Sequence, residues 1–158
     1  MPILDRTDYA IRALVEIARA TPAEGSLGTE EIGRRQGIPP LFLHKVLREL
    51  VEAGILTASR GRKGGLRLAR PPAGITLEAV VEATQGGIRL RPCVLGDGNC
   101  SREDICPVRK LWQEMQGGIL ERLAGTTLAD LLPEEKEAGA YQWGKGGTNT
   151  RSSEVKES

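Results

Sequence analysis

The spacing of hydrophobic positions predicts three helices in the first third of the chain. The first spans residues 7–20. The second spans residues 29–37, and Thr29 is expected to cap it. The third spans residues 39–54 and opens with two prolines, where a missing amide hydrogen costs little. The first and third helices each have one apolar side, which predicts two buried faces: Ala10, Leu14, Ile17 and Ala18 in one, and Leu43, Val46, Leu47 and Leu50 in the other.

The period then changes from helix-like to strand-like. Residues 55–59 and 66–70 alternate apolar and polar side chains, and the glycine-rich segment GRKGG lies between them. Two helices joined by a short turn at Gly37 and followed by a basic hairpin are the order of elements in a winged helix-turn-helix. The expected fold class is therefore mainly α with a small β-hairpin wing.

The second half of the chain is expected to hold three further helices. A short helix is capped by Thr76 and ends near Gly86, and a long helix begins at Pro107. Thr127 is expected to cap a last short helix that ends at Leu132. The long helix carries an apolar stripe, typical either of a dimer seam or of an internal core helix, made of Val108, Leu111, Trp112, Met115, Ile119 and Leu123.

These elements divide the chain into five expected parts. Residues 1–72 form a winged helix-turn-helix domain, 73–92 form a connecting helix and loop, and 93–106 form a cysteine loop. Residues 107–132 hold the dimerisation helix and the short last helix. The segment 133–158 is polar and rich in Gly, Ser and Thr, so we expect it to be a disordered tail.

Composition favours a chain that shares part of its core with a second copy. Only 3% of the 158 residues are aromatic, so one chain has little bulk for a large core of its own. The N-terminus has no apolar run behind a basic start, and no apolar stretch approaches the roughly 18 residues of a membrane span. We therefore expect a cytoplasmic protein.

Positive charge is confined to one segment of the chain. Residues 28–70 carry nine basic and four acidic side chains, a net charge of +5 in a chain whose total is +1. This distribution is the electrostatic footprint of a nucleic-acid-binding surface, although charge runs are often only solvated faces. Because the charged hairpin directly follows the helix-turn-helix, DNA binding is the favoured interpretation.

The third helix and the hairpin are expected to contact DNA. Lys45 and Arg48 lie on the polar face of the helix, within reach of base edges or phosphates. Arg60, Arg62 and Lys63 at the hairpin tip are placed for phosphate or minor-groove contacts. The expected DNA-binding set is completed by Thr29, Pro40, Phe42, His44 and Gly64, the last because glycine lets the backbone turn tightly.

The chain has three cysteines, Cys93, Cys100 and Cys106, in a Gly- and Asp-rich stretch just before the long helix. Loops of six and five residues let three thiolates converge on one point. Iron–sulfur clusters are held in this way, commonly with a fourth ligand from elsewhere. An odd number of cysteines does not suit a structural disulfide framework, and clustered cysteines in a cytosolic protein favour metal binding or redox chemistry.

A resemblance to a known family covers the chain to about residue 132. It is carried by DYAIRALVEIA, TEEIGRRQGIPPLFLHKVLRELVEAGIL, SRGRKGGLRLAR, ITLEAVVEAT, the cysteine loop and TTLADLL. These segments resemble the bacterial winged-helix regulators that include the iron–sulfur regulator IscR and the nitric-oxide-sensitive repressor NsrR. The resemblance implies a homodimer held by the helix from Pro107, a pseudo-palindromic double-stranded operator, and a 2Fe–2S or 4Fe–4S cluster on the three cysteines.

The fourth cluster ligand differs between subgroups of this family. IscR-like members place a histidine three residues after the last cysteine, where this chain has Arg109. The only histidine, His44, lies among residues expected to face DNA. NsrR-like members use an aspartate near the N-terminus, supplied by the partner subunit, and Asp8 stands at the matching place. A carboxylate in a first helical turn also suits the helix dipole, so Asp8 has both interpretations.

Other chemistries remain alternatives for the cysteine loop. Relatives commonly have two gaps of five residues, so the longer first gap keeps Asp97, Glu103 and Asp104 as further candidate ligands. Structural zinc is one rival, and a thiol switch in which Cys100 and Cys106 form a disulfide is another. An enzyme is a remote alternative, because GRKGG lacks the strand–loop–helix context of a phosphate-binding loop.

Overall fold

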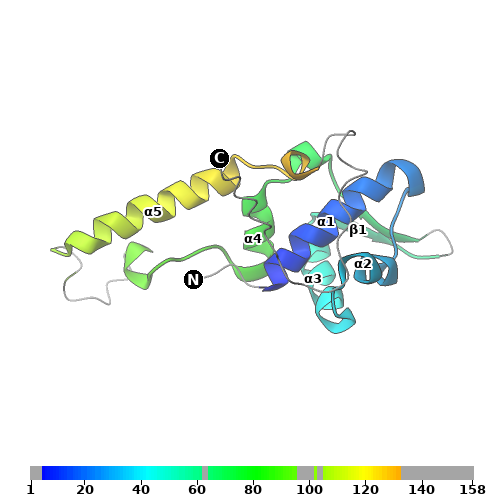
Figure 1. Cartoon of the computed structure of the whole chain (residues 1–158), viewed down its shortest axis with the longest axis horizontal. Coiled ribbons are helices and arrows are strands. Elements are labelled where there is room, and N and C mark those ends of the chain that lie inside the picture. Colours follow the sequence, from blue (N-terminus) through cyan, green and yellow to red (C-terminus); the bar gives the residue numbers. More distant parts are fainter. Residues whose placement is uncertain (1–4, 62–63, 96–101, 103–104, 133–158) are drawn as a thin grey trace, which may run out of the picture.

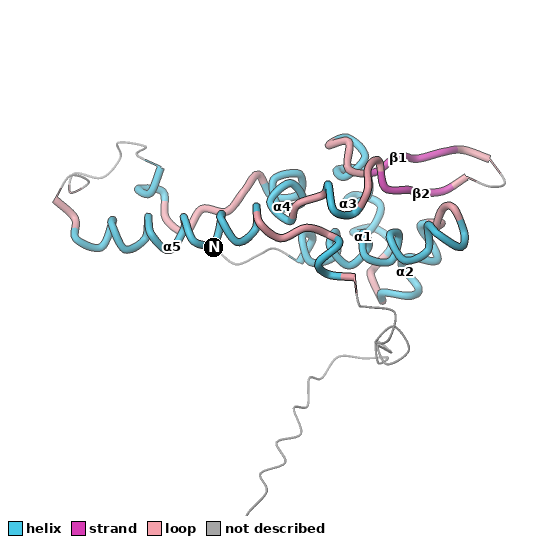
Figure 2. Tube along the Cα trace, turned by 90° about the horizontal axis from the view of Figure 1, so that it is seen from above, coloured by secondary structure: helices cyan, strands magenta, loops and turns pink. Residues whose placement is uncertain are grey.

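The computed structural model describes residues 5–61, 64–95, 102 and 105–132, so the expected tail lies outside the described residues. The described chain is mainly helical with one two-stranded antiparallel sheet, which confirms the expected fold class. Figures 1 and 2 show an elongated molecule in which α1–α3 and the hairpin form a head, and α5 extends away from it beyond α4. The elements are α1 (Asp5–Glu24), α2 (Thr29–Gln36), α3 (Pro40–Glu52), β1 (Leu56–Ser59), β2 (Gly65–Leu68), η1 (Pro72–Gly74), α4 (Leu77–Gln85), η2 (Pro92–Leu95), α5 (Pro107–Ala124) and η3 (Ala129–Leu131).

Helix α1 lies at the centre of the head. Its predicted inner face, including Ala10, Leu14 and Ile17, is fully buried, and the helix packs against α2, α3, α4 and β2. The predicted end near residue 20 was wrong, because the helix continues to Glu24. It stops before Gly25, which has a left-handed φ of 74°. A left-handed glycine is a common helix terminator, and it ends this helix in preference to the earlier proline.

Helices α2 and α3 are joined by the short turn that the sequence predicted. Gly37 reverses the chain with a φ of 62°, and Pro40 is the first residue of α3. The predicted cap at Thr29 was wrong. Gly28 is the N-cap residue, and its carbonyl oxygen accepts a hydrogen bond from the Ile32 amide at 3.1 Å, while no side chain caps this helix.

Strands β1 and β2 form the predicted hairpin, with shorter strands than expected. The register pairs Leu56 with Leu68. Leu66 also exchanges two backbone hydrogen bonds with Leu27, at 3.0 and 3.1 Å, which ties the hairpin to the segment before α2. The second strand ends before two consecutive prolines, which have no amide hydrogen to continue a ladder.

Helix α4 has the boundaries that its sequence predicted. The Thr76 hydroxyl oxygen accepts a hydrogen bond from the Ala79 amide at 3.2 Å, and Gly86 ends the helix with a φ of 71°. The buried hydroxyl groups of Thr84 and Thr7 are 2.7 Å apart, so a hydrogen bond joins α4 to the start of α1.

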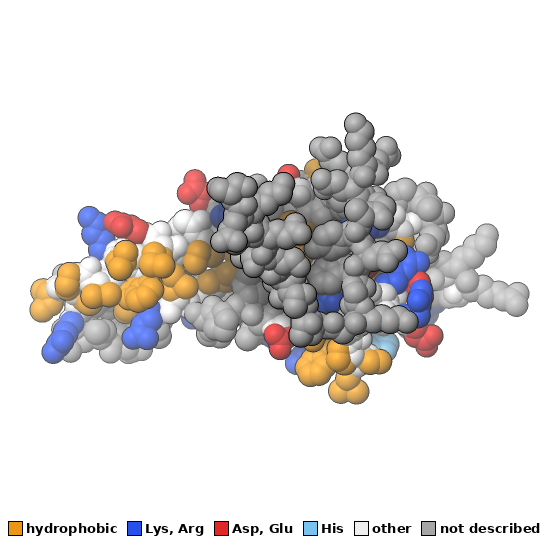
Figure 3. All heavy atoms as spheres, viewed as in Figure 1, with side chains coloured by type: hydrophobic (Ala, Val, Ile, Leu, Met, Phe, Trp, Pro, Cys, Tyr) orange, Lys and Arg blue, Asp and Glu red, His pale blue; other side chains and the backbone are white. Residues whose placement is uncertain are grey.

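Helix α5 begins at Pro107, as predicted, and carries much of its apolar stripe on the surface. The exposed fractions are 48% for Val108, 51% for Leu111 and 47% for Met115. Figure 3 shows hydrophobic side chains in a row along this helix. Within a single chain, therefore, α5 is not an internal core helix, and that alternative was wrong. Among the described residues, no helix combines the length and apolar character needed to cross a membrane.

After α5 the chain returns to the head. The Leu128 amide donates a hydrogen bond to the Ile75 carbonyl oxygen at 2.8 Å, and the Leu128 side chain is fully buried in the core. The predicted cap at Thr127 was wrong, because Leu128 is the N-cap residue of η3. The Thr127 amide and hydroxyl instead donate to the Asp130 carboxylate, each at 2.7 Å, which lowers the pKa of Asp130.

The substitution Leu128→Ala is expected to lower the free energy of unfolding by about 2–5 kcal/mol, because it removes a fully buried leucine from the core. Leu131→Ala is the matched control. Leu131 is 38% exposed, so its loss is expected to cost under about 1 kcal/mol. Urea denaturation at a fixed protein concentration measures both values. Equal losses would contradict an anchoring role for Leu128.

Candidate DNA-binding surface and cysteine site

Helix α3 has one buried side and one exposed side. The four residues predicted to be buried are all in the core: Leu43, Val46, Leu47 and Leu50. On the opposite side lie Leu41, Lys45 and Arg48, which are exposed and share one stripe because they are spaced i, i+4 and i+7. His44 is exposed beside this stripe. The second helix of a helix-turn-helix presents such a face to the major groove.

A buried polar network fixes α2 against α1 and positions α3. Gln36 Nε2 donates to Glu16 Oε1 at 2.7 Å, and Arg12 Nε donates to Gln36 Oε1 at 3.0 Å. The Arg12 guanidinium also donates to the Gln36 carbonyl oxygen, and it lies 5.9 Å from the centre of the Tyr9 ring. The rings of Tyr9 and Phe42 have centres 6.4 Å apart. Phe42 at the start of α3 is therefore held by α1.

Two acidic side chains offset part of the positive charge on this surface. Glu52 accepts a hydrogen bond from Arg48 at 2.7 Å, which raises the pKa of Arg48. Glu31 accepts hydrogen bonds from Arg34 and from Arg35, and these bonds lower the pKa of Glu31 to about 2. The three arginines therefore have carboxylate partners before they meet any phosphate.

The helix-turn-helix brings several predicted DNA-binding residues together. Thr29, Pro40 and His44 contribute to the walls of a surface groove of about 480 Å³ between α2 and α3. Arg60 lies apart from them, exposed immediately after β1 at the far end of the hairpin. Arg62 and Lys63 lie outside the described residues.

The hairpin turn has no room for a side chain at Gly64. Its amide donates a hydrogen bond to the Gly61 carbonyl oxygen at 2.8 Å. A Cβ atom on Gly64 would lie 2.4 Å from the Ser59 carbonyl oxygen, closer than a side chain can approach backbone. Any other residue here must distort the turn that presents Arg60.

Two side chains of α5 hold the segment that contains Cys93 against the helix. Cys93 lies in η2 and Cys106 is the N-cap residue of α5, and both thiols are free and half-buried. Arg109 Nε donates to the Cys93 carbonyl oxygen at 3.1 Å, and the Leu90 amide donates to Gln116 Oε1 at 3.0 Å. These two side chains therefore hold residues 90–93 against α5.

Sequence reasoning missed Arg109 and Gln116 as positioning residues. Their separation of seven places, which puts them on one side of α5, was the available signal. Within the described part of the chain, no three His, Cys, Asp or Glu side chains are grouped closely enough to hold a metal ion. Four candidate ligands fall outside that part: Cys100, Asp97, Glu103 and Asp104.

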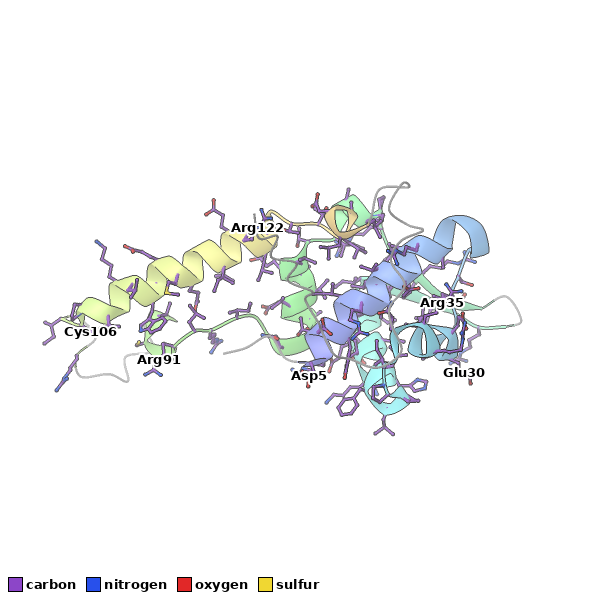
Figure 4. The ribbon with its side chains drawn as sticks, viewed as in Figure 1. Asp5, Glu30, Arg35, Arg91, Cys106 and Arg122 are labelled. Atoms are coloured by element: carbon purple, nitrogen blue, oxygen red, sulfur yellow. The ribbon has the colours of Figure 1, made fainter. Side chains whose placement is uncertain are left out.

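Asp8 lies in α1, in the head of the molecule. Its exposed carboxylate is 3.4 Å from Arg12 Nη1. Figure 4 shows Asp5, one helical turn earlier, in the head and Cys106 at the opposite end of the elongated molecule. Asp8 therefore does not lie beside Cys106 of the same chain.

Comparison with known proteins identifies the family. The model of the Rrf2 family, described as an iron-dependent transcriptional regulator, matches residues 3–134. Protein aau3 of Rhizobium meliloti (strain 1021) is 35% identical over 133 residues, which cover 84% of this chain and 85% of that protein. The HTH-type transcriptional regulator NsrR of Geobacillus kaustophilus (strain HTA426) is 34% identical over 135 residues, which cover 85% and 91% of the two chains.

Solved structures share the fold. T. potens IscR aligns with a TM-score of 0.70 at 25% identity, over 92% of this chain and 94% of that one. CymR, the global cysteine regulator of B. subtilis, aligns with a TM-score of 0.68 at 24% identity, over 83% and 95%. The family consists of transcriptional regulators, so the enzyme alternative was wrong. The chain belongs to the Rrf2 family of DNA-binding transcriptional regulators.

Proposed function

We propose that this protein is a homodimeric regulator whose affinity for its operator is controlled by an iron–sulfur cluster on Cys93, Cys100 and Cys106. The observation that carries the proposal is the hydrogen bond from Arg109 to the Cys93 carbonyl oxygen. It ties the segment of one thiol to the first turn of α5, the helix whose N-cap residue is Cys106. A cluster at this end of the molecule is connected through α5 to the head.

The donor set suits an iron–sulfur cluster. Thiolates are the usual ligands of such clusters, and the sulfur of Cys106 is not used to cap α5. Together with Cys93 and Cys100 it provides three thiolates for a 2Fe–2S or a 4Fe–4S cluster. When bound, the cluster supplies iron that reacts with nitric oxide or changes its oxidation state.

We infer that the dimer forms through the exposed stripe of α5. Contact between two such stripes removes Val108, Leu111 and Met115 from water, which is favourable. Two-fold symmetry then places each α3 on one half-site of a pseudo-palindromic operator. The hairpin residues Arg60, Arg62 and Lys63 reach the phosphates or the minor groove. A regulator that binds DNA in a bacterium acts in the cytoplasm, which is the proposed location of this protein.

Asp8 of the partner subunit is the proposed fourth ligand. Within its own chain Asp8 pairs with Arg12, which also donates to Gln36 of α2 and lies over the Tyr9 ring. A carboxylate that held iron would leave this arginine, so ligation by Asp8 would change the contacts that position the helix-turn-helix. Oxygen ligands are harder than thiolates and more easily displaced from such a cluster, which favours a gas- or redox-responsive regulator with nitric oxide as the leading signal.

Glu52→Gln is expected to strengthen binding to DNA of any sequence at low salt. The change frees Arg48 for a phosphate and removes a negative charge from the surface. The slope of log affinity against log salt should become steeper by about 0.9 for one additional phosphate contact. Fluorescence anisotropy over a salt series measures it. Glu78→Gln, an equal charge change on α4, is the control, and equal slopes in both variants would exclude a phosphate contact by Arg48.

Protein purified without oxygen is expected to contain matched iron and acid-labile sulfide and to absorb visible light. Cys93→Ala and Cys106→Ala should lose all three signals. Arg109→Gln should lower the cluster content, because it frees the Cys93 segment while it keeps every thiol. Lys110→Gln, a neighbouring exposed cation, is the matched control.

Zinc content, protein mass and DNA affinity separate the rival chemistries. A colourless protein with one zinc ion per chain would replace the cluster by structural zinc. A mass shift that matches a disulfide, with a parallel change of DNA affinity, would replace it by a thiol switch.

Asp8→Ala is expected to retain the three thiolates and yet lose the cluster severalfold faster during titration with nitric oxide, because one ligand is missing. Stopped-flow absorbance in the visible range follows the loss. Asp5→Ala, which removes a carboxylate one turn away, is the control. Identical rates in both variants would remove Asp8 from the mechanism.

A further inference from the structure

We propose that Leu41, supported by Phe42, reads thymine methyl groups in the major groove of the operator. This inference rests on the proposed DNA-binding function and names the part of the operator that α3 recognises. It assigns a base contact to Leu41, which the sequence analysis did not include among the expected DNA-binding residues, and a supporting role to Phe42, which it did.

Leu41 and Phe42 are exposed although they are large and apolar. Their exposed fractions are 87% and 57%. Figure 3 shows a compact hydrophobic patch on this edge of the head, directly beside the single histidine. Pro39 and Pro40 fix the backbone immediately before these two residues, at the start of α3. An exposed apolar patch of this kind marks a contact surface.

The position of Leu41 on α3 points toward base edges. It lies in the first turn of the second helix of the helix-turn-helix, and residues at this place contact bases in DNA complexes. Lys45 and Arg48 follow on the same stripe, one and two turns later. The stripe is therefore apolar at its tip and cationic behind it.

The major groove complements this arrangement. Thymine offers a C5-methyl group there, the apolar feature among the hydrogen-bonding groups of the four bases. The phosphates beside the groove are negative, so they match Lys45 and Arg48. An apolar tip with cations behind it thus fits a thymine in duplex DNA better than a purely apolar protein groove.

Phe42 stabilises the tip of α3. Its ring lies against Tyr9 of α1, with centres 6.4 Å apart and planes inclined by 57°. The Arg12 guanidinium lies over the Tyr9 ring, 5.9 Å from its centre. Leu41 therefore projects from a helix end that already has a fixed position, and little ordering is needed when it meets a base.

The test removes only the methyl group. An operator is first selected from random duplex DNA with the wild-type protein, and each thymine of a half-site is then replaced by deoxyuridine. At one or two positions the wild type is expected to lose roughly fourfold in affinity per methyl group. Leu41→Ala should bind the thymine operator more weakly, and it should show no further loss on the deoxyuridine operator at those positions. Leu41→Met should retain the discrimination.

The inference is overturned if the wild type binds the thymine and deoxyuridine operators with equal affinity. It is also overturned if Leu41→Ala lowers the affinity, relative to the wild type, by the same factor on both operators. Either result assigns the patch to another contact while the DNA-binding function stands. Failure of the wild type to select any sequence, at low salt and with every cluster state, is a different result. It would overturn the proposed function and the inference with it. Because Leu41 is exposed, the variant is expected to fold normally, which circular dichroism checks.

Discussion

The head of this molecule depends on the buried face of α1, because this one helix contacts α2, α3, α4 and β2. Ala10 and Ala13 are small, so neighbouring elements approach closely, and Leu14 and Ile17 fill the space between them. Close aliphatic packing replaces aromatic bulk in a chain that has little of it. Because α1 packs against both helices of the helix-turn-helix, we expect a displacement of α1 to move them with it.

The shortage of bulk also explains the position of α5. The core of the head closes around Leu128 and leaves α5 outside, with Leu111 and Met115 in water. In the proposed dimer, a second copy covers this face and brings another head to the cysteine end of the helix. Asp8 of the partner subunit is the fourth ligand in that proposal, because α1 of the same chain begins far from Cys106. The proposal thus derives both dimerisation and the fourth ligand from the exposed apolar side of α5.

Much of the fold was predictable, because a helix that buries one face has apolar residues at regular helical spacing in the sequence. The cap at Thr76 was also predictable, since its partner lies three residues away. The cap at Thr29 was wrong because the choice between it and Gly28 depends on the backbone path. Arg109 and Gln116 were missed because their partners are backbone groups 16 and 26 residues away, and only the fold brings them together.

In the proposed complex, the two parts of the α3 stripe contribute to recognition in different ways. Attraction between cations and phosphates acts on every sequence, so it raises specific and non-specific affinity together. Glu52 limits this term, because it occupies Arg48 in the free protein. A contact between Leu41 and a methyl group forms only where thymine stands, so it adds affinity at the operator alone. Because a genome offers many competing sites, the ratio of the two affinities determines occupancy of the operator. The pairing of Arg48 with Glu52 lowers both affinities alike and leaves that ratio unchanged. The contact of Leu41 with a thymine methyl group increases the ratio, because it forms at the operator alone.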